Sequence, residues 1–379
     1  MKWNLDMSSS YKPDVIIFMT DEERAIPPYE APEVLEWRDN VLSGRNWFKD
    51  NGVSFNRHYT GSLACVPSRP TLFTGQFPDV HGVTQTDGLG KDAYDARMRW
   101  LPPREVPTLG HWFRAAGYDT HYDGKWHISH ADLVDESTGK PLATNTSDGT
   151  ILQDAVKQYL EMNPLNEYGF SGWVGPEPHG ALLGNSGIIR DPLIADRTVQ
   201  WLEDRYRRRN LGDSDALKPF LLVVSFVNPH DIVLLPLYMR RPENNPYLPS
   251  DFDPPDIPIP PTRYEDLSSK PAAQIAYKYS YYSGYGVQRA VQRLYESNEQ
   301  EYRNLYYRMH LEVDNPLDMV RKAVIADGSR EKIIFRTSDH GDLLGAHGGL
   351  HQKWFNLYDE ATRVPFEIVK YGGTQSHKA

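Results

Sequence analysis

The sequence predicts an α/β fold built on a large, mostly parallel central sheet flanked by helices. Three apolar runs indicate the strands, at residues 14–20, 220–227 and 332–337. The first run lacks polar alternation, which is typical of a strand buried on both faces of a parallel sheet. Helical stretches precede the other two runs. This recurrent alternation of strand and helix favours an open sheet with helices on both sides.

The remaining elements follow from turn and cap residues. A helix over residues 32–50 should end at Asn51-Gly52, and residues 53–59 should return as a short strand, giving a β-α-β order. Thr108 is the expected N-cap of a helix that stops at Gly117, followed by a strand over 118–122. Further helices are expected within 271–327, where we interpret the many tyrosines as packing residues. A last strand is expected at 365–370.

Composition indicates a globular protein. Its length would allow two or three ordinary domains or one large α/β domain, and from the motifs below we expect a single domain over residues 1–379. The chain is 39% hydrophobic and 24% charged, with a net charge of −10, which disfavours a nucleic-acid partner. We found neither a secretory signal nor a segment apolar enough to span a bilayer, and the single cysteine allows no internal disulfide. The sequence therefore predicts a cytoplasmic protein without a membrane partner. Assembly into homo-oligomers is left open.

A proline-rich segment covers residues 229–265. Nine prolines between residues 236 and 261 exclude long regular structure there. Loops of this length in compact proteins usually lie over functional sites. We interpret the segment as a lid or wall of the active site, with a purely structural excursion as the alternative.

Polar side chains gather where the predicted strands end. A single Asp at a strand end is more often a helix cap, and a single His is more often a structural residue. The polar residues of this chain, however, would meet at one edge of a parallel sheet, which is where such sheets bind ligands. They are Asp21, Glu22, Lys125, His127, His230, Asp339 and His340. The acidic residues with His340 offer oxygen ligands and one imidazole, which suits Ca²⁺, Mg²⁺ or Mn²⁺. The lysine and the other histidines suit an anionic substrate.

The only cysteine opens the motif Cys65-Val-Pro-Ser-Arg69, followed four residues later by Thr74-Gly75. Prolines suit the first turn of a helix and Gly75 its end, so Cys65 should lie near a helix N-terminus, where backbone N–H groups favour anions. A buried, inert cysteine is the alternative.

The Cys65 motif and the strand-end residues occur in an order that resembles the sulfatases of the alkaline phosphatase-like superfamily. The resemblance also rests on Gly117-Tyr-Asp-Thr, Gly124-Lys-Trp-His127, Asn228-Pro-His230, Ser338-Asp-His-Gly-Asp342 and Lys353 in His351-Gln-Lys-Trp. It implies that Cys65 is oxidised to formylglycine by a formylglycine-generating enzyme. The hydrate of this group would attack the sulfur of a small sulfate ester, releasing an alcohol or phenol and inorganic sulfate.

The resemblance also implies residue roles. Arg69 would hold the hydrate, and Lys125 and Lys353 would neutralise sulfate oxygens. His127 would take a proton when the covalent intermediate collapses, and His230 would serve the leaving group. Residue 65 would join Asp21, Glu22, Asp339 and His340 around one divalent cation, with Ca²⁺ expected first and Mn²⁺ or Mg²⁺ as alternatives.

Two departures from the family pattern bear on function. Many sulfatases have Asp-Asp and Asp-Asn at the metal positions, whereas this chain has Asp21-Glu22 and Asp339-His340. The Asp339-His340 pair resembles the pair at this position in choline sulfatases and phosphonate monoester hydrolases. Hydrolysis of a phosphonate monoester or phosphodiester is therefore the alternative activity. The small antiparallel C-terminal subdomain of the family is expected to be missing or shortened, and a non-catalytic binding protein is a third hypothesis.

Overall fold

The computed structural model describes residues 12–88, 91–178, 180–284, 289–353 and 356–372. Its strands are β1 (Asp14–Asp21), β2 (Val53–Ser54), β3 (Asp119–Gly124), β4 (Val134–Asp135), β5 (Lys140–Pro141), β6 (Phe220–Pro229), β7 (Lys332–Ser338) and β8 (Phe366–Tyr371). Its longer helices are α1 (Pro32–Val41), α2 (Ser43–Asn51), α3 (Cys65–Thr74), α5 (Leu109–Ala115), α6 (Gln153–Met162), α7 (Gly187–Asn210), α9 (Ala272–Gly284), α10 (Arg289–Ser297) and α11 (Glu299–Ala326). Short helices are α4 (Pro78–His81), α8 (Leu235–Arg240), α12 (Ala346–Gly349) and α13 (Asp359–Thr362).

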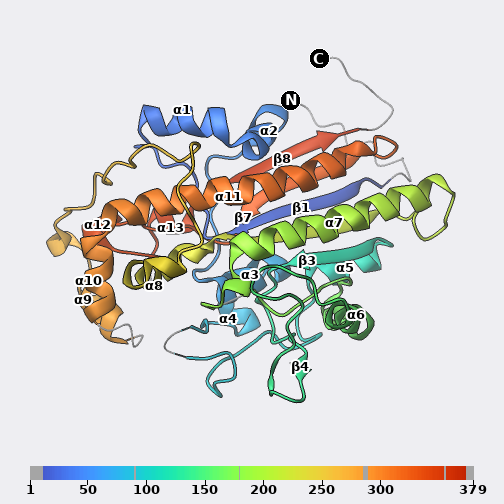
Figure 1. Ribbon diagram of the computed structural model, residues 1–379, viewed down its shortest axis with the longest axis horizontal. Coiled ribbons are helices and arrows are strands. Elements are labelled where there is room, and N and C mark those ends of the chain that lie inside the picture. Colours follow the sequence, from blue (N-terminus) through green and yellow to red (C-terminus); the bar gives the residue numbers. More distant parts are fainter. Residues whose placement is uncertain (1–11, 89–90, 179, 285–288, 354–355, 373–379) are drawn as a thin grey trace.

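The described strands form a central sheet in the order β2-β8-β7-β1-β6-β3, beside a small β4-β5 hairpin. Strand β1 lies inside the sheet and pairs in parallel with both neighbours, Val15 lying opposite Leu221 of β6 and Ile333 of β7. Strand β3 is also parallel to β6, whereas β8 runs antiparallel to β7. The structure confirms the predicted mostly parallel sheet (Figure 1).

Helices cover both faces of the sheet, as predicted. Alternate side chains of β1 point to opposite faces. Val15 and Ile17 pack in the core that contains residues of α3 and α6, with the partly buried Leu109 of α5 against it. Ile16 and Phe18 pack on the opposite face against residues of α2, α7 and α11. Figure 1 shows α7 and α11 lying across the sheet on this second face.

The helix predicted over 32–50 is two helices, and this prediction is corrected. The chain leaves the helical conformation at Leu42, whose side chain is buried. Because of this break, the N-terminus of α2 contacts α11. There the carboxylate of Asp314 accepts hydrogen bonds from the backbone N–H groups of Gly44 and Arg45 at 2.7 and 3.0 Å. A carboxylate stabilises a helix N-terminus through its unpaired N–H groups and dipole.

The strand predicted over 53–59 is also corrected. Only Val53–Ser54 pairs as a strand, and it runs antiparallel to β8 at the sheet edge. Beyond it, Tyr59 makes an isolated bridge to Arg363. The segment therefore does not form a parallel β-α-β unit with β1. Among the described strands β2 is the outermost of the sheet, and its side chains at Val53 and Ser54 are exposed.

The proline-rich segment 229–265 contains only short helical turns before it becomes irregular, as expected from its prolines. The segment packs along α11. The carboxylate of Asp253 pairs with Arg308 of this helix at 2.6 Å, and the carbonyl of Ile257 accepts a hydrogen bond from Arg303 at 2.9 Å. Its role as a lid stays a prediction. Across the described residues, none of the helices combines the length and apolar character needed to cross a membrane.

Candidate active site

Four strand ends bring the predicted polar residues to one edge of the sheet. Asp21 closes β1, Lys125 follows β3, His230 follows β6 and Asp339 follows β7. Because these strands are parallel neighbours, their carboxyl ends meet, which is where open α/β sheets bind ligands. All four side chains are buried. The sequence-based expectation that they lie together is met.

Helix α3 presents Cys65 at its first turn. The helix ends at Gly75, whose left-handed conformation (φ 69°) lets its N–H close on the carbonyl of Thr71 at 3.0 Å. Ser68 fixes the first turn to the end of β7, because its hydroxyl donates to the Asp339 carbonyl at 2.6 Å. Cys65 is only 3% exposed and lies at the positive end of the helix dipole.

The cysteine lies inside a group of potential metal ligands. Its thiol donates to Asp21 Oδ1 at 3.3 Å, and its sulfur lies 3.1 Å from His340 Nε2. Ligand atoms of Asp21, Cys65, Asp339 and His340 all lie within 4.8 Å of one another. Asp21, Glu22 and His230 form a second group by the same measure. The first group contains four of the five predicted metal ligands, and the fifth, Glu22, joins the second group with Asp21.

Buried cations surround these carboxylates. Arg69 binds Asp21 Oδ2 at 2.9 Å through Nη2 and Asp339 Oδ2 at 2.8 Å through Nε. Lys125 Nζ lies 2.8 Å from Asp21 Oδ2, and Lys353 Nζ lies 2.7 Å from Glu22 Oε2. Such pairs offset the cost of burying charge. Arg69 therefore holds the carboxylates of β1 and β7 together beneath Cys65.

The two neighbouring acids at the end of β1 differ in electrostatics. Burial alone would raise the pKa of Asp21, but Lys125, His230 and Arg69 outweigh it and hold that pKa well below its usual range. Burial raises the pKa of Glu22 well above its usual range despite Lys353. Its Oε1 is buried without a hydrogen-bond partner in the part of the chain that the structure describes. A hard divalent cation fits this donor set, because it would supply the missing partner and stabilise the ionised form.

His127 reaches the same edge but has a partner that the sequence did not reveal. Its Nε2 lies 2.8 Å from Oδ1 of Asp87, in the loop after α4. Burial lowers the pKa of His127, but Asp87 overrides it and raises the pKa to about 10. The stretch around Asp87 carries no motif, so only the three-dimensional structure identifies this pair.

Two tyrosines of α11, taken from the sequence as packing residues, also support the site. Tyr302 donates to Asp342 Oδ1 at 2.6 Å, and Tyr306 donates to the backbone carbonyl of Glu22 at 2.7 Å. Both are buried. Their spacing of four residues places them on one face of the helix, which was the signal available in the sequence.

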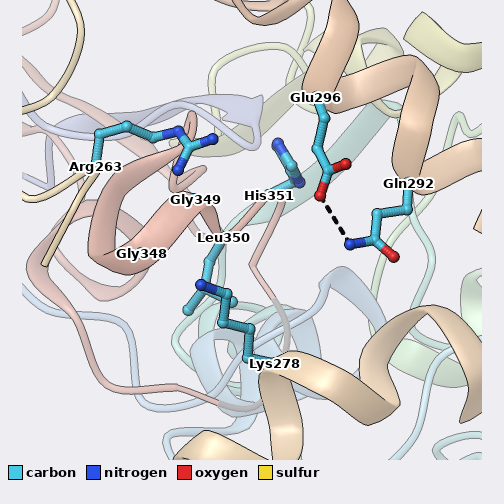
Figure 2. A pocket seen from close by; sticks show the side chains of 8 residues that line it. All are labelled: Arg263, Lys278, Gln292, Glu296, Gly348, Gly349, Leu350 and His351. Atoms are coloured by element: carbon cyan, nitrogen blue, oxygen red, sulfur yellow. Dashed lines mark hydrogen bonds between the residues drawn. The ribbon is translucent and has the colours of Figure 1, made fainter. Parts of the chain in front are cut away.

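A separate cavity of about 100 Å³ adjoins the segment that carries Lys353. Figure 2 shows its lining side chains, which come from the end of the proline-rich segment, from α9 and α10, and from residues 348–351. Its lining residues are Arg263, Lys278, Gln292, Glu296, Gly348, Gly349, Leu350 and His351. None of the clustered ligands or cations described above belongs to this lining, so the cavity is distinct from the site at the strand ends.

The family model described as "Sulfatase" matches residues 39–379, and the chain belongs to this family. It is similar to the "Uncharacterized sulfatase YidJ" of Escherichia coli (27% identity over 323 residues, 84% of this chain and 55% of the relative). It is also similar to choline-sulfatase of Rhizobium meliloti (24% over 367 residues, 95% and 63%). The chain therefore spans roughly three fifths of these relatives.

Solved structures support the fold. A putative sulfatase from Bacteroides thetaiotaomicron superposes with a TM-score of 0.58 at 20% identity, covering 96% of this chain and 65% of that one. The phosphonate monoester hydrolase of Agrobacterium radiobacter superposes with a TM-score of 0.54 at 19% identity, covering 94% and 68%.

Proposed function

We propose that the chain hydrolyses a sulfate ester to an alcohol or phenol and inorganic sulfate, with residue 65 carrying the nucleophile. The observation that supports this most is the position of Cys65 at the start of α3, 3.3 Å from Asp21 and 3.1 Å from His340. Oxidation of Cys65 by a formylglycine-generating enzyme would supply a hydrated aldehyde, with one hydroxyl to attack sulfur and another whose deprotonation releases sulfate.

The chain's own residues would bind the ester and move protons. Lys125 and Lys353 lie buried at the strand-end edge and would attract sulfate oxygens, as positioned charges do in phosphoryl transfer. Arg69 would hold residue 65 in place. His127 would take the proton of residue 65 when the covalent intermediate collapses, and Asp87, which raises the pKa of the ring, would favour the protonated form that results. His230, after β6, would serve the leaving-group oxygen.

Asp21, Glu22, Asp339 and His340, with residue 65, would hold one divalent cation, Ca²⁺ first and Mn²⁺ or Mg²⁺ as alternatives. The unpartnered Glu22 Oε1 and the predominance of oxygen donors support this assignment. When bound, the cation would polarise sulfate oxygens and lower the pKa of the attacking hydroxyl.

The proline-rich segment 229–265 is proposed to wall the substrate pocket. It begins at His230 within the site, and its Tyr247 returns to the same place, where the hydroxyl bonds Asp231 and Asn228. This return keeps the first turn of the segment against the strand ends. The alcohol portion of a small-molecule ester would lie between this turn and residue 65.

Hydrolysis of a phosphonate monoester or phosphodiester by the same site is the second candidate. It is favoured by His340, because the imidazole replaces the amide that many sulfatases place after the Asp. The likeness to a phosphonate monoester hydrolase concerns the fold alone.

Co-expression of the chain with and without a formylglycine-generating enzyme tests the proposal. Mass spectrometry of the peptide that spans Cys65 should show loss of the thiol only with the enzyme, and that preparation should release sulfate from an aryl sulfate. Cys65→Ala is the matched control and should be inactive. Ratios of kcat/KM for aryl sulfate and aryl phosphonate esters separate the two candidates. An intact thiol with unchanged turnover in Cys65→Ala would exclude both.

A further inference from the structure

The loop that carries Asp87 is fixed to the helix that carries Cys65. In the last turn of α3, Thr71 Oγ1 lies 3.0 Å from His81 Nε2. The other ring nitrogen of His81 accepts the backbone N–H of Val83 at 3.1 Å, and the Val83 side chain is fully buried in the core. Asp87 is four residues further along. The start of the segment that leads to Asp87 is therefore anchored to α3.

Asp87 and His127 form a buried pair beside residue 65. The side chains are 8% and 1% exposed, and Asp87 Oδ1 lies 2.8 Å from His127 Nε2. The Cys65 side chain is also among the neighbours that raise the pKa of His127. The imidazole therefore has a carboxylate on one ring nitrogen and the proposed nucleophile among its neighbours, which are the groups of an acid–histidine–nucleophile arrangement.

The backbone of His127 has an uncommon conformation beside hydrogen bonds and packing contacts that hold the residue. His127 has a φ of 51°, in the left-handed region that residues with a side chain rarely adopt. Its N–H donates to Glu177 Oε2 at 2.9 Å, and Glu177 is held in turn by Asp132, which accepts its N–H at 2.7 Å. Trp100 packs on the ring at 5.7 Å between centroids. Strain of this kind gathers at functional sites.

We propose that Asp87 is a positioning residue for His127. The Asp87 carboxylate accepts the hydrogen bond from His127 Nε2–H and so fixes the ring towards residue 65. The inference rests on the proposed function, because it assigns the group that prepares His127 for proton transfer. The backbone bond to Glu177 places the residue, and Trp100 packs against its ring. Asp87 supplies the contact that selects one ring orientation.

Asp87→Asn and Asp87→Ala test this in the chain co-expressed with a formylglycine-generating enzyme. Loss of a group that prepares an acid–base residue should lower kcat for an aryl sulfate by about 10²-fold, with KM changed less than about threefold. Asp87→Glu should recover part of kcat. The matched control is Asp79→Asn, an exposed residue of the preceding helix, which should behave as the unaltered chain. Thermal melts of each variant identify any that is unfolded.

A second readout needs no turnover. With ¹⁵N-labelled histidine, the unaltered chain should show a strongly deshielded ring N–H proton that vanishes in His127→Ala and in Asp87→Asn but persists in Asp79→Asn. If the unaltered chain proves inactive, the proposed function fails and this signal alone decides the assignment of Asp87. A folded Asp87→Asn with an unchanged ring signal, or with unchanged kcat, would overturn the inference.

Discussion

Glu22 and Glu23 are adjacent and both fully buried, yet they meet opposite environments. Glu23 is saturated: its carboxylate accepts from Thr20 at 2.8 Å and from Arg45 at 3.0 and 2.9 Å, and it also binds Arg336. Burial would raise its pKa, but the two arginines hold that pKa well below its usual range. Glu22 has one cation, Lys353, an unpartnered oxygen within the described structure, and a raised pKa.

The backbone separates the two side chains. Glu22 has a φ of 68°, in the left-handed region, directly after β1 ends. Its N–H is held by Asp339 Oδ1 at 3.1 Å, while the N–H of Glu23 is held by Ser338 Oγ at 3.0 Å. Both anchors belong to the end of β7 or the residue after it. The turn therefore directs Glu22 to the cluster around Cys65 and Glu23 to the opposite, arginine-rich side.

The difference separates a buried carboxylate with a structural role from one in a ligand-binding site: the first has all of its oxygens paired, and the second keeps an unpaired oxygen. Buried polar groups are nearly always paired, so an orphaned carboxylate oxygen needs an explanation. Both oxygens of the Glu23 carboxylate are paired without any further partner. The Glu22 cluster is incomplete, and a cation would complete it. The following predictions use the matched substitutions Glu22→Gln and Glu23→Gln.

The largest effect should be on stability. Glu23→Gln removes a charge that two buried arginines need, so the free energy of unfolding should fall by about 3–5 kcal/mol. Glu22→Gln in the metal-free protein removes a carboxylate that pairs with one cation, Lys353, and whose pKa is already raised, so it should lower the free energy of unfolding by less than Glu23→Gln does. Urea denaturation with a chelator present measures both. Equal losses would show that the two networks are alike.

Activity should show the reverse ranking. With divalent cation added, Glu22→Gln should lower kcat/KM for an aryl sulfate by about 10²-fold, because the substitution would weaken a proposed ligand of the proposed catalytic cation. Glu23→Gln, assayed at a temperature where it stays folded, should remain within about threefold of the unaltered chain. A Glu22→Gln variant that turns over normally would remove Glu22 from the site.

The pH dependence of stability should differ in sign. Glu23 has a lowered pKa in the folded chain, so its stabilisation is present above the ordinary glutamate pKa of about 4.3 and is lost as pH falls. Glu22 has a raised pKa, so without metal it increasingly destabilises the fold as pH rises above about 4.3. Subtracting the unfolding free energies of each Gln variant from those of the unaltered chain across pH measures both slopes. Slopes of the same sign would contradict the comparison.

The smallest effect should come from Tyr306→Phe. Its hydroxyl donates to the Glu22 carbonyl and accepts the N–H of Arg24 at 2.9 Å, so its loss leaves two buried backbone groups unpaired. We expect destabilisation of about 1–2 kcal/mol and a cation affinity only a few-fold weaker. Phe in place of Tyr307, whose hydroxyl contacts Glu30 and Arg24 side chains instead, is the control and should leave cation affinity unchanged.

Much of the fold and of the candidate site could be predicted from sequence for a physical reason. Apolar runs mark buried parallel strands, and such strands end together, so Asp21 and Asp339 could be brought together without coordinates. The break at Leu42 could not be predicted, because it depends on Asp314, which is some 270 residues away in sequence. Asp87 was missed because its role depends on a loop anchored by long-range contacts rather than on a motif.

The central claim is that the Glu22 cluster is a cation site and the Glu23 network is not. Titration calorimetry of Ca²⁺, Mn²⁺ and Mg²⁺ into the metal-free protein tests it most directly. The unaltered chain should bind one divalent cation, Glu22→Gln should bind it at least about tenfold more weakly, and folded Glu23→Gln should bind it as the unaltered chain does. No binding by the unaltered chain, or equal affinity in the unaltered chain and Glu22→Gln, would contradict the account.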